Sequence, residues 1–93
     1  MTPLALVTAI IALIPKGLDA LTDLRTVLTK WVDDQKQRDF LEGCVDMCRD
    51  ILIDNPGLPF ADQQRYCADA IREYGINCGQ NVDAALKMLG TEE

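Results

Sequence analysis

Four cysteines are the side chains of this sequence best suited to chemistry, because a thiolate can bind a metal, form a disulfide or act as a nucleophile. They are Cys44, Cys48, Cys67 and Cys78. The first two are four residues apart and share one face of a helix, whereas ten residues separate the last two, a wider spacing than zinc ligand pairs usually have. Three alternatives remain: buried core thiols, one disulfide, or a four-cysteine metal site. We favour buried thiols without a metal.

The common forms of enzymatic catalysis need residues that this sequence lacks. The 93 residues include no histidine and no serine, which excludes a Ser-His-Asp triad, a Cys-His dyad and a histidine-bearing zinc site. Asp33 and Asp34 are paired carboxylates, but their polar surroundings in sequence provide nothing to exclude water or shift a pKa. We therefore predict a non-enzymatic protein without a cofactor.

Three further carboxylates recur every four residues, at Asp46, Asp50 and Asp54. This spacing could gather them on one helical face as a cation site. They lack the D-x-D-x-D-G loop and the terminal glutamate of a calcium site, and Arg49 interrupts the negative charge. We predict a solvated outer face and no metal site.

The charge of the chain argues against a nucleic-acid partner. The net charge is −6. Residues 1–38 carry five basic and four acidic side chains, whereas residues 39–93 carry four basic and eleven acidic ones. Binding to a phosphate backbone requires a dense group of Lys and Arg side chains. We therefore predict no direct binding of DNA or RNA.

The composition predicts an all-α fold, with a long helical arm at the N-terminus. Apolar residues make up 48% of the chain and aromatic residues only 5%, which is typical of an Ala-, Leu- and Ile-rich helical protein. Thr2 and Pro3 suit a helix start, and the first helix should reach Ile14. Pro15 should kink or break it, because proline lacks an N–H and clashes with the preceding turn.

An apolar ladder at helical spacing continues through Pro15, with Arg25 as its only polar member. We predict that the amphipathic arm, residues 1–36, presents this face to another molecule. Trp31 lies near the end of the ladder, where it could be a core anchor between arm and bundle or an amphipathic residue at a membrane surface. The predicted interaction face consists of Val7, Ile11, Ile14, Leu18, Leu21, Leu28, Trp31 and Val32.

Residues 37–93 are predicted to form a compact three-helix bundle within the same single domain. The apolar pattern pauses around residues 33–39 and resumes out of phase, which predicts a break before a helix over 37–53. A turn at Asn55-Pro56-Gly57 leads to a helix over 61–74 with Phe60, Cys67, Ile71 and Tyr74 inside. Gly75-Ile76 should end that helix. The last helix, over 80–89, should bury Val82, Ala85, Leu86 and Leu89.

The N-terminal apolar segment is short for a transmembrane helix. Fifteen residues precede the first side-chain charge at Lys16, which corresponds to about 22 Å of helix, whereas a bilayer core is about 30 Å thick. Insertion through this segment as an oligomer remains an alternative. No basic residue precedes the segment and no cleavage-like site follows it. We expect an intracellular product with reduced cysteines, located in a virion or in the host inner membrane.

Three motifs in the second half carry a resemblance to a known family. They are Tyr66-Cys67-Ala68, Gly75-Ile76 and the stretch Val82-Asp83-Ala84-Ala85-Leu86. From Phe40 onward the chain resembles the soluble tail of small phage holin-like proteins of the LL-H type. The resemblance implies a hydrophobic N-terminal segment followed by a helical tail, in a protein that oligomerises in the host membrane during lysis.

These observations lead to two alternative functions. The first is a non-enzymatic, self-assembling helical protein, a structural component of a phage virion whose N-terminal arm packs against copies of itself or other phage structural proteins. The alternative is a membrane-active, holin-like or ejection protein that inserts its N-terminal hydrophobic helix as an oligomer.

Overall fold

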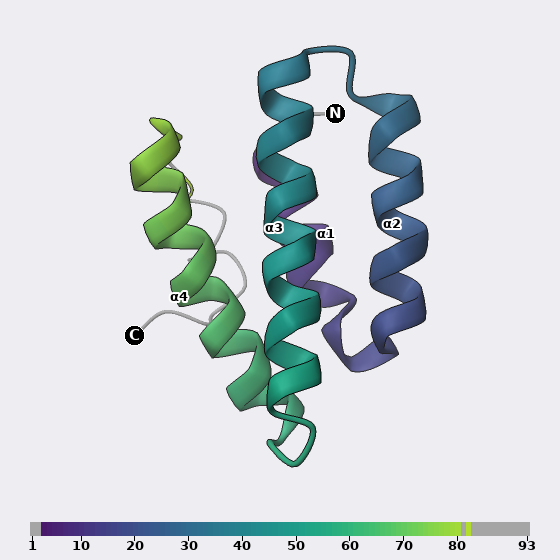
Figure 1. Cartoon of the computed structure of the whole chain (residues 1–93), viewed down its shortest axis with the longest axis vertical. Coiled ribbons are helices and arrows are strands. Elements are labelled where there is room, and N and C mark those ends of the chain that lie inside the picture. The colour runs from purple at the N-terminus through teal and green to yellow at the C-terminus, as the bar shows by residue number, and fades with distance from the viewer. Residues whose placement is uncertain (1–2, 81, 83–93) are drawn as a thin grey trace.

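Pro15 and Gly17 divide the N-terminal third of the chain into two helices. The computed structural model describes residues 3–80 and 82. Helix α1 covers Pro3–Ala12, a short 3₁₀ helix (η1) covers Ile14–Lys16, and α2 covers Leu18–Trp31. Gly17 has a φ of 97°, a backbone conformation that other residues rarely adopt. The interruption near Pro15 is therefore a break, and the chain turns back at it, so that α1 and α2 form a helical hairpin (Figure 1).

Helix α3 covers Gln35–Asp54. Asp34 caps its start, because its Oδ1 accepts a hydrogen bond of 3.0 Å from the Gln37 N–H. At the other end, the side-chain amide of Asn55 donates to the Ile51 carbonyl at 3.0 Å. The predicted helix over 37–53 and the turn that follows it are confirmed, although the cap at Asp34 starts the helix two residues earlier.

Helix α4 covers Phe60–Cys78, so the prediction that Gly75 ends it is wrong. The helix ends at Gly79, which has a φ of 74° and the left-handed conformation. Gly75 serves close packing instead, because a Cβ there would lie 2.9 Å from the Gln80 carbonyl oxygen and 3.4 Å from Cγ2 of Val82. The chain returns over Gly75 and buries Val82. Of the predicted last helix, Gln80 and Val82 are not helical, and residues 81 and 83–89 lie outside the described part.

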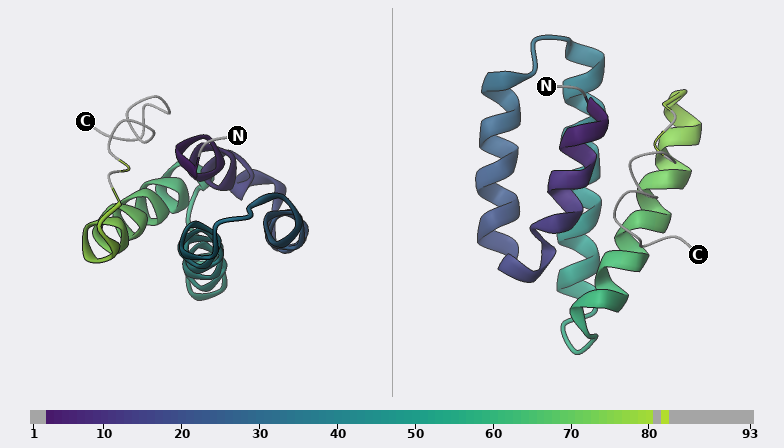
Figure 2. Two further views of the ribbon diagram at one scale, coloured as in Figure 1. Left: turned by 90° about the horizontal axis from the view of Figure 1, so that it is seen from above. Right: turned by 180° about the vertical axis from the view of Figure 1, so that it is seen from behind.

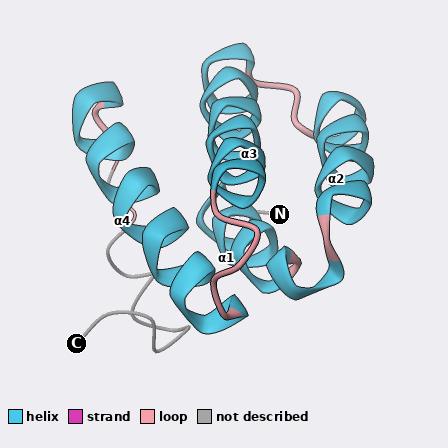
Figure 3. Cartoon of the chain, turned by 60° about the horizontal axis from the view of Figure 1, so that its bottom comes forward, coloured by secondary structure: helices cyan, strands magenta, loops and turns pink. Residues whose placement is uncertain are grey.

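The helices pack around α3. Seen from above, α2 and α4 lie on opposite sides of α3, and α1 lies behind α3 between them (Figure 2). Within residues 3–80 and 82 every regular element is a helix, and short loops join them (Figure 3). The predicted all-α class is confirmed. The Cα radius of gyration is 12.1 Å, close to the value of about 12 Å for a compact globule of this length.

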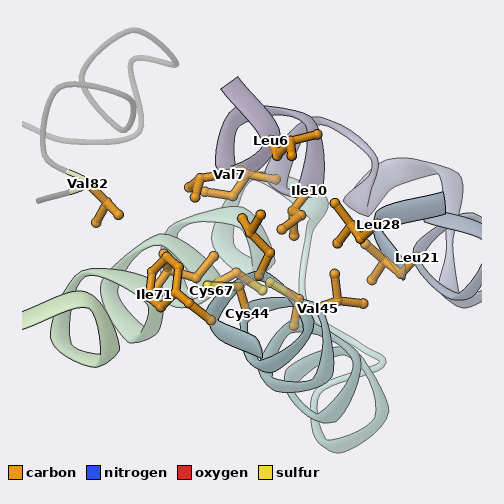
Figure 4. Packing of buried hydrophobic residues seen from close by; sticks show 14 of the residues in the cluster. Leu6, Val7, Ile10, Leu21, Leu28, Cys44, Val45, Cys67, Ile71 and Val82 are labelled. Atoms are coloured by element: carbon orange, nitrogen blue, oxygen red, sulfur yellow. The ribbon is translucent and has the colours of Figure 1, made fainter. Parts of the chain in front are cut away.

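Side chains from all four helices share one buried apolar cluster. In Figure 4, Val7 and Ile10 of α1 face α3 and α4, while Leu21 and Leu28 approach from α2. Both predicted segments, 1–36 and 37–93, therefore contribute to the same core. The cluster consists of Leu6, Val7, Ile10, Ile11, Ile14, Leu21, Leu28, Val32, Phe40, Leu41, Cys44, Val45, Cys48, Cys67, Ala68, Ile71 and Val82.

A polar contact also connects α1 to the rest of the molecule. The Gln64 side-chain amide of α4 donates a hydrogen bond of 3.1 Å to the Ile11 carbonyl, one of the carbonyls that a helix end leaves without an intrahelical partner. Phe60 is 54% exposed, so the prediction that it points inside is wrong. It opens α4 at the chain reversal, where α3 has already ended at Asp54.

The described residues contain no helix that is both long enough and apolar enough to span a membrane. Helix α1, the most apolar segment, has 10 residues.

Candidate functional site

The core takes up most of the predicted interaction face. Five of its eight side chains have no exposed surface and Val32 is 9% exposed. Contact between the five fully buried side chains and another molecule would require the N-terminal helices to leave the core. Leu18, at 38% exposed, and Trp31, at 63% exposed, remain accessible. The six buried members are Val7, Ile11, Ile14, Leu21, Leu28 and Val32.

Trp31 borders a cavity at the corner between α2 and α3. The cavity has a volume of about 320 Å³. Leu6, Val32 and Leu41 lie behind it in the core, and the exposed edges of Leu6 (3%) and Val32 (9%) form a narrow apolar floor. The polar members are exposed or half-buried. We call this cavity the Trp31 pocket, and its lining consists of Leu6, Trp31, Val32, Asp33, Asp34, Gln37 and Leu41.

The end of α2 explains why Trp31 is exposed beside a buried valine. Val32 is the C-cap of α2 and has an extended backbone conformation, with φ −99° and ψ 109°. Its side chain enters the core while Trp31, the last helical residue, stays outside. The Arg38 guanidinium donates to the Val32 carbonyl at 3.5 Å and braces the connection. Of the two alternatives for Trp31, the core anchor is therefore wrong.

A second polar site, which the sequence did not predict, lies between α2 and α3. The Arg25 guanidinium binds the Asp46 carboxylate at two points, with Nε 3.0 Å from Oδ1 and Nη2 3.4 Å from Oδ2. Nη1 of Arg49 lies 3.9 Å from the same Oδ1. The hydrogen bond with Asp46, followed by the attraction of its charge, raises the pKa of Arg25. Asp46 is 48% exposed, as a solvated face requires, and it also has an interhelical partner that the sequence did not predict.

This ion pair borders an open groove of about 440 Å³. Thr29 contributes a further link between α2 and α3, because its hydroxyl donates to Oε2 of Glu42 at 2.9 Å. A signal for the pair existed in the sequence, since Arg25 was the only polar member of an apolar ladder. Its partner could not be identified without knowing which helix packs there. The groove is lined by Thr22, Arg25, Thr26, Thr29, Lys30, Asp46 and Arg49.

The four cysteines belong to α3 and α4, and all are free thiols. Cys44, Cys48 and Cys67 are buried and Cys78 is exposed. The buried-thiol alternative is confirmed for the first three, and no disulfide joins any of the four. Cys44 and Cys67 lie among the core side chains in Figure 4. Among residues 3–80 and 82, no three Cys, Asp or Glu side chains meet in an arrangement that could hold a metal ion.

Two of the buried thiols, Cys44 and Cys48, are poor nucleophiles near neutral pH. Desolvation by burial raises the pKa of Cys44 to about 12. A hydrogen bond with Cys67, followed by burial, raises the pKa of Cys48. The same hydrogen bond lowers the pKa of Cys67. Because the thiolate is the reactive form, Cys44 and Cys48 act as core residues.

Tyr74 fixes the contact between the first half of α3 and the second half of α4. Its ring stacks on Phe40 with centroids 5.1 Å apart and an interplanar angle of 11°. The ring passes close to Gly43, where an added Cβ would lie 2.5 Å from the tyrosine oxygen. Desolvation by burial raises the pKa of Tyr74.

Comparisons of this chain with protein-family models, curated proteins and solved structures found no match. The resemblance to phage holin-like proteins therefore stays a prediction.

Proposed function

We propose that this chain is a non-enzymatic helical protein that works by packing against another protein, with Trp31 at the centre of the contact. One observation carries the proposal: Trp31 is 63% exposed and forms the wall of a cavity whose floor is already apolar. Tryptophan is enriched among the residues that dominate binding energy at protein interfaces. Covering Trp31 would bury a large apolar surface without disturbing the core.

Trp31 differs from the other exposed large apolar side chains of the described part. None of those others lines the Trp31 pocket. A side chain of a partner protein binds best where an apolar contact surface borders a cavity that can receive it. The inventory of the chain supports the non-enzymatic part of the proposal, because histidine and serine are absent from the sequence. The other exposed large apolar residues of the described part are Leu18, Ile53, Phe60, Tyr66 and Ile76.

The proposal keeps the class of function that the sequence predicted and moves the contact away from α1. A second copy of the chain or another component of the same assembly would then cover Trp31, while α1 stays in the core. Assembly within a phage virion is part of the proposal and rests on the resemblance carried by residues 66–68, 75–76 and 82–86.

Light scattering of the full chain over a wide concentration range tests the proposal, combined with the emission of Trp31, the single tryptophan. We expect self-association to move the emission to shorter wavelength and the Trp31→Ala variant to stay monomeric. Phe60→Ala is the matched control, because Phe60 is a similarly exposed aromatic residue outside the pocket. Equal association of the wild type and Trp31→Ala would contradict the proposal. A wild type that is monomeric throughout would exclude a second copy as the partner.

A further inference from the structure

We propose that the Trp31 pocket receives the guanidinium group of an arginine side chain from the partner protein. This inference rests on the proposed function, because it names the chemistry of the group that covers Trp31. Three features of the pocket favour this occupant: the indole ring of Trp31, the carboxylates of Asp33 and Asp34, and the apolar floor.

The carboxylates define the charge of the occupant. Asp33 and Asp34 are both exposed and line the pocket. The Asp34 carboxylate caps α3 through Oδ1. Within residues 3–80 and 82, neither aspartate forms a salt bridge. No basic residue lines the pocket, so its lining has a formal charge of −2. Arg38 contacts a residue of the lining, because its guanidinium donates to the Val32 carbonyl at 3.5 Å.

This arrangement disfavours other occupants. An acidic side chain would be repelled by both carboxylates. A purely apolar side chain would cover the floor but remove water from the carboxylates without replacing its hydrogen bonds, which is unfavourable. A cationic side chain with an apolar stem satisfies both parts, because its methylene groups cover the floor while its charge stays at the acidic rim.

The indole ring favours arginine over lysine. A guanidinium group is planar and can stack on an indole face, and its paired N–H donors match a carboxylate. A lysine ammonium group is compact and strongly hydrated, so it gains less from a flat aromatic wall. The pocket combines both guanidinium-binding elements within the four consecutive residues 31–34.

Nuclear magnetic resonance of the full chain can test this, because the single tryptophan gives one indole N–H signal. The probes are blocked tripeptides with alanine at both ends and arginine, citrulline, lysine or glutamate in the middle. Citrulline is the neutral counterpart of arginine, with almost the same shape. We expect the arginine peptide to shift the indole signal saturably at millimolar concentration. The citrulline peptide should bind about three- to tenfold more weakly, because it loses the cation–π and ionic contacts.

The Asp33→Asn/Asp34→Asn variant should weaken binding of the arginine peptide by about three- to tenfold. Asparagine caps helices as well as aspartate does, so this variant should keep α3 intact, which circular dichroism can verify. The matched control is Asp23→Asn/Asp50→Asn, which changes the net charge equally at two exposed positions outside the pocket. The control should change the affinity less than twofold.

Three outcomes would overturn the inference and leave the proposed function standing. The first is equal binding of the arginine and citrulline peptides, which would show that the positive charge of the guanidinium group does not contribute to binding. The second is an unmoved indole signal with every peptide, while light scattering still shows association that depends on Trp31. Equal binding of the lysine and arginine peptides would overturn the assignment of a guanidinium group. A failure of the proposed function itself would appear only in the light-scattering experiment, as association that is independent of Trp31.

Discussion

Replacing Ile11 with alanine tests directly whether α1 belongs to the core of its own chain. Ile11 is fully buried, and its backbone carbonyl accepts the hydrogen bond from Gln64 of α4. Removing a buried isoleucine side chain down to alanine typically costs about 2–5 kcal/mol, because apolar contacts are lost and a cavity is left. A chain of this length has a total free energy of unfolding of about 5–14 kcal/mol. The substitution should therefore remove a large part of the stability.

The same substitution at an exposed position provides the control. Ile53 lies in the last turn of α3 and is 56% exposed. Ile53→Ala should change the free energy of unfolding by less than about 0.5 kcal/mol, as is usual for surface substitutions. In terms of melting temperature, we expect a fall of about 8–40 °C for Ile11→Ala, at about 4–8 °C per kcal/mol. Ile53→Ala should stay within a few degrees of the wild type.

The assay is urea unfolding followed by circular dichroism, at two protein concentrations that differ at least twentyfold. If α1 packs within its own chain, the midpoint should not depend on concentration, since unfolding is then unimolecular. A Trp31→Ala background separates this test from association through the Trp31 pocket. Equal losses for Ile11→Ala and Ile53→Ala would refute the reasoning. So would a midpoint that rises with concentration in the Trp31→Ala background, because α1 would then be stabilised by another copy.

Three further predictions concern the cysteines and the end of α4. Burial raises the pKa of Cys44 from 9.0 to about 12, so the folded state binds the thiol proton more tightly than the unfolded state does. The contribution of the protonated Cys44 to stability is therefore complete below pH 9 and decreases between pH 9 and 12. The loss is up to about 4 kcal/mol, and urea titrations against pH should show a steeper loss for the wild type than for Cys44→Ala. A maleimide should modify one thiol per native chain, at the exposed Cys78, and four in urea; mass spectrometry showing rapid native modification of two or more would contradict this. Gly75→Ala should lower the melting temperature, because the new Cβ would meet the backbone oxygen of Gln80 at 2.9 Å and overpacking costs about 1–3 kcal/mol. This cost should exceed the gain of about 1 kcal/mol from the better helix propensity of alanine. An unchanged or higher melting temperature would show that the returning chain does not pack there.

Local sequence signals predicted the helical elements well where one residue controls a boundary. Pro15 interrupts the first helix, and Asn55-Pro56-Gly57 separates α3 from α4. Such signals are reliable because they depend on a missing N–H or a permitted backbone angle within a few residues. Gly75 shows the limit of this reasoning. A glycine can serve backbone freedom or close packing, and here the neighbour at residue 82, outside the helix, decides between them.

The candidate site was predicted only in its parts. The sequence placed Trp31 on the apolar face of the arm and Asp33 and Asp34 in a pair of carboxylates. It did not indicate that these three residues form one site. The pocket also includes Leu6 and Leu41 in its lining, and these come from α1 and α3. The pairing of Arg25 with Asp46 was missed for the same reason, because it joins residues 21 positions apart on different helices.

By itself, the sequence determined that this chain is helical, that α1 and α2 carry buried apolar faces, and that familiar catalytic designs based on histidine or serine are absent. These conclusions depend on residue types and on spacing within one helix. Only the tertiary structure decided what covers those faces. An apolar ladder shows that a surface must leave water, but it carries no information about the molecule that covers it. The break at residues 15–17 turns α2 back, and with α1 and α2 both packed on α3 the chain buries the ladder in its own core and leaves Trp31 outside.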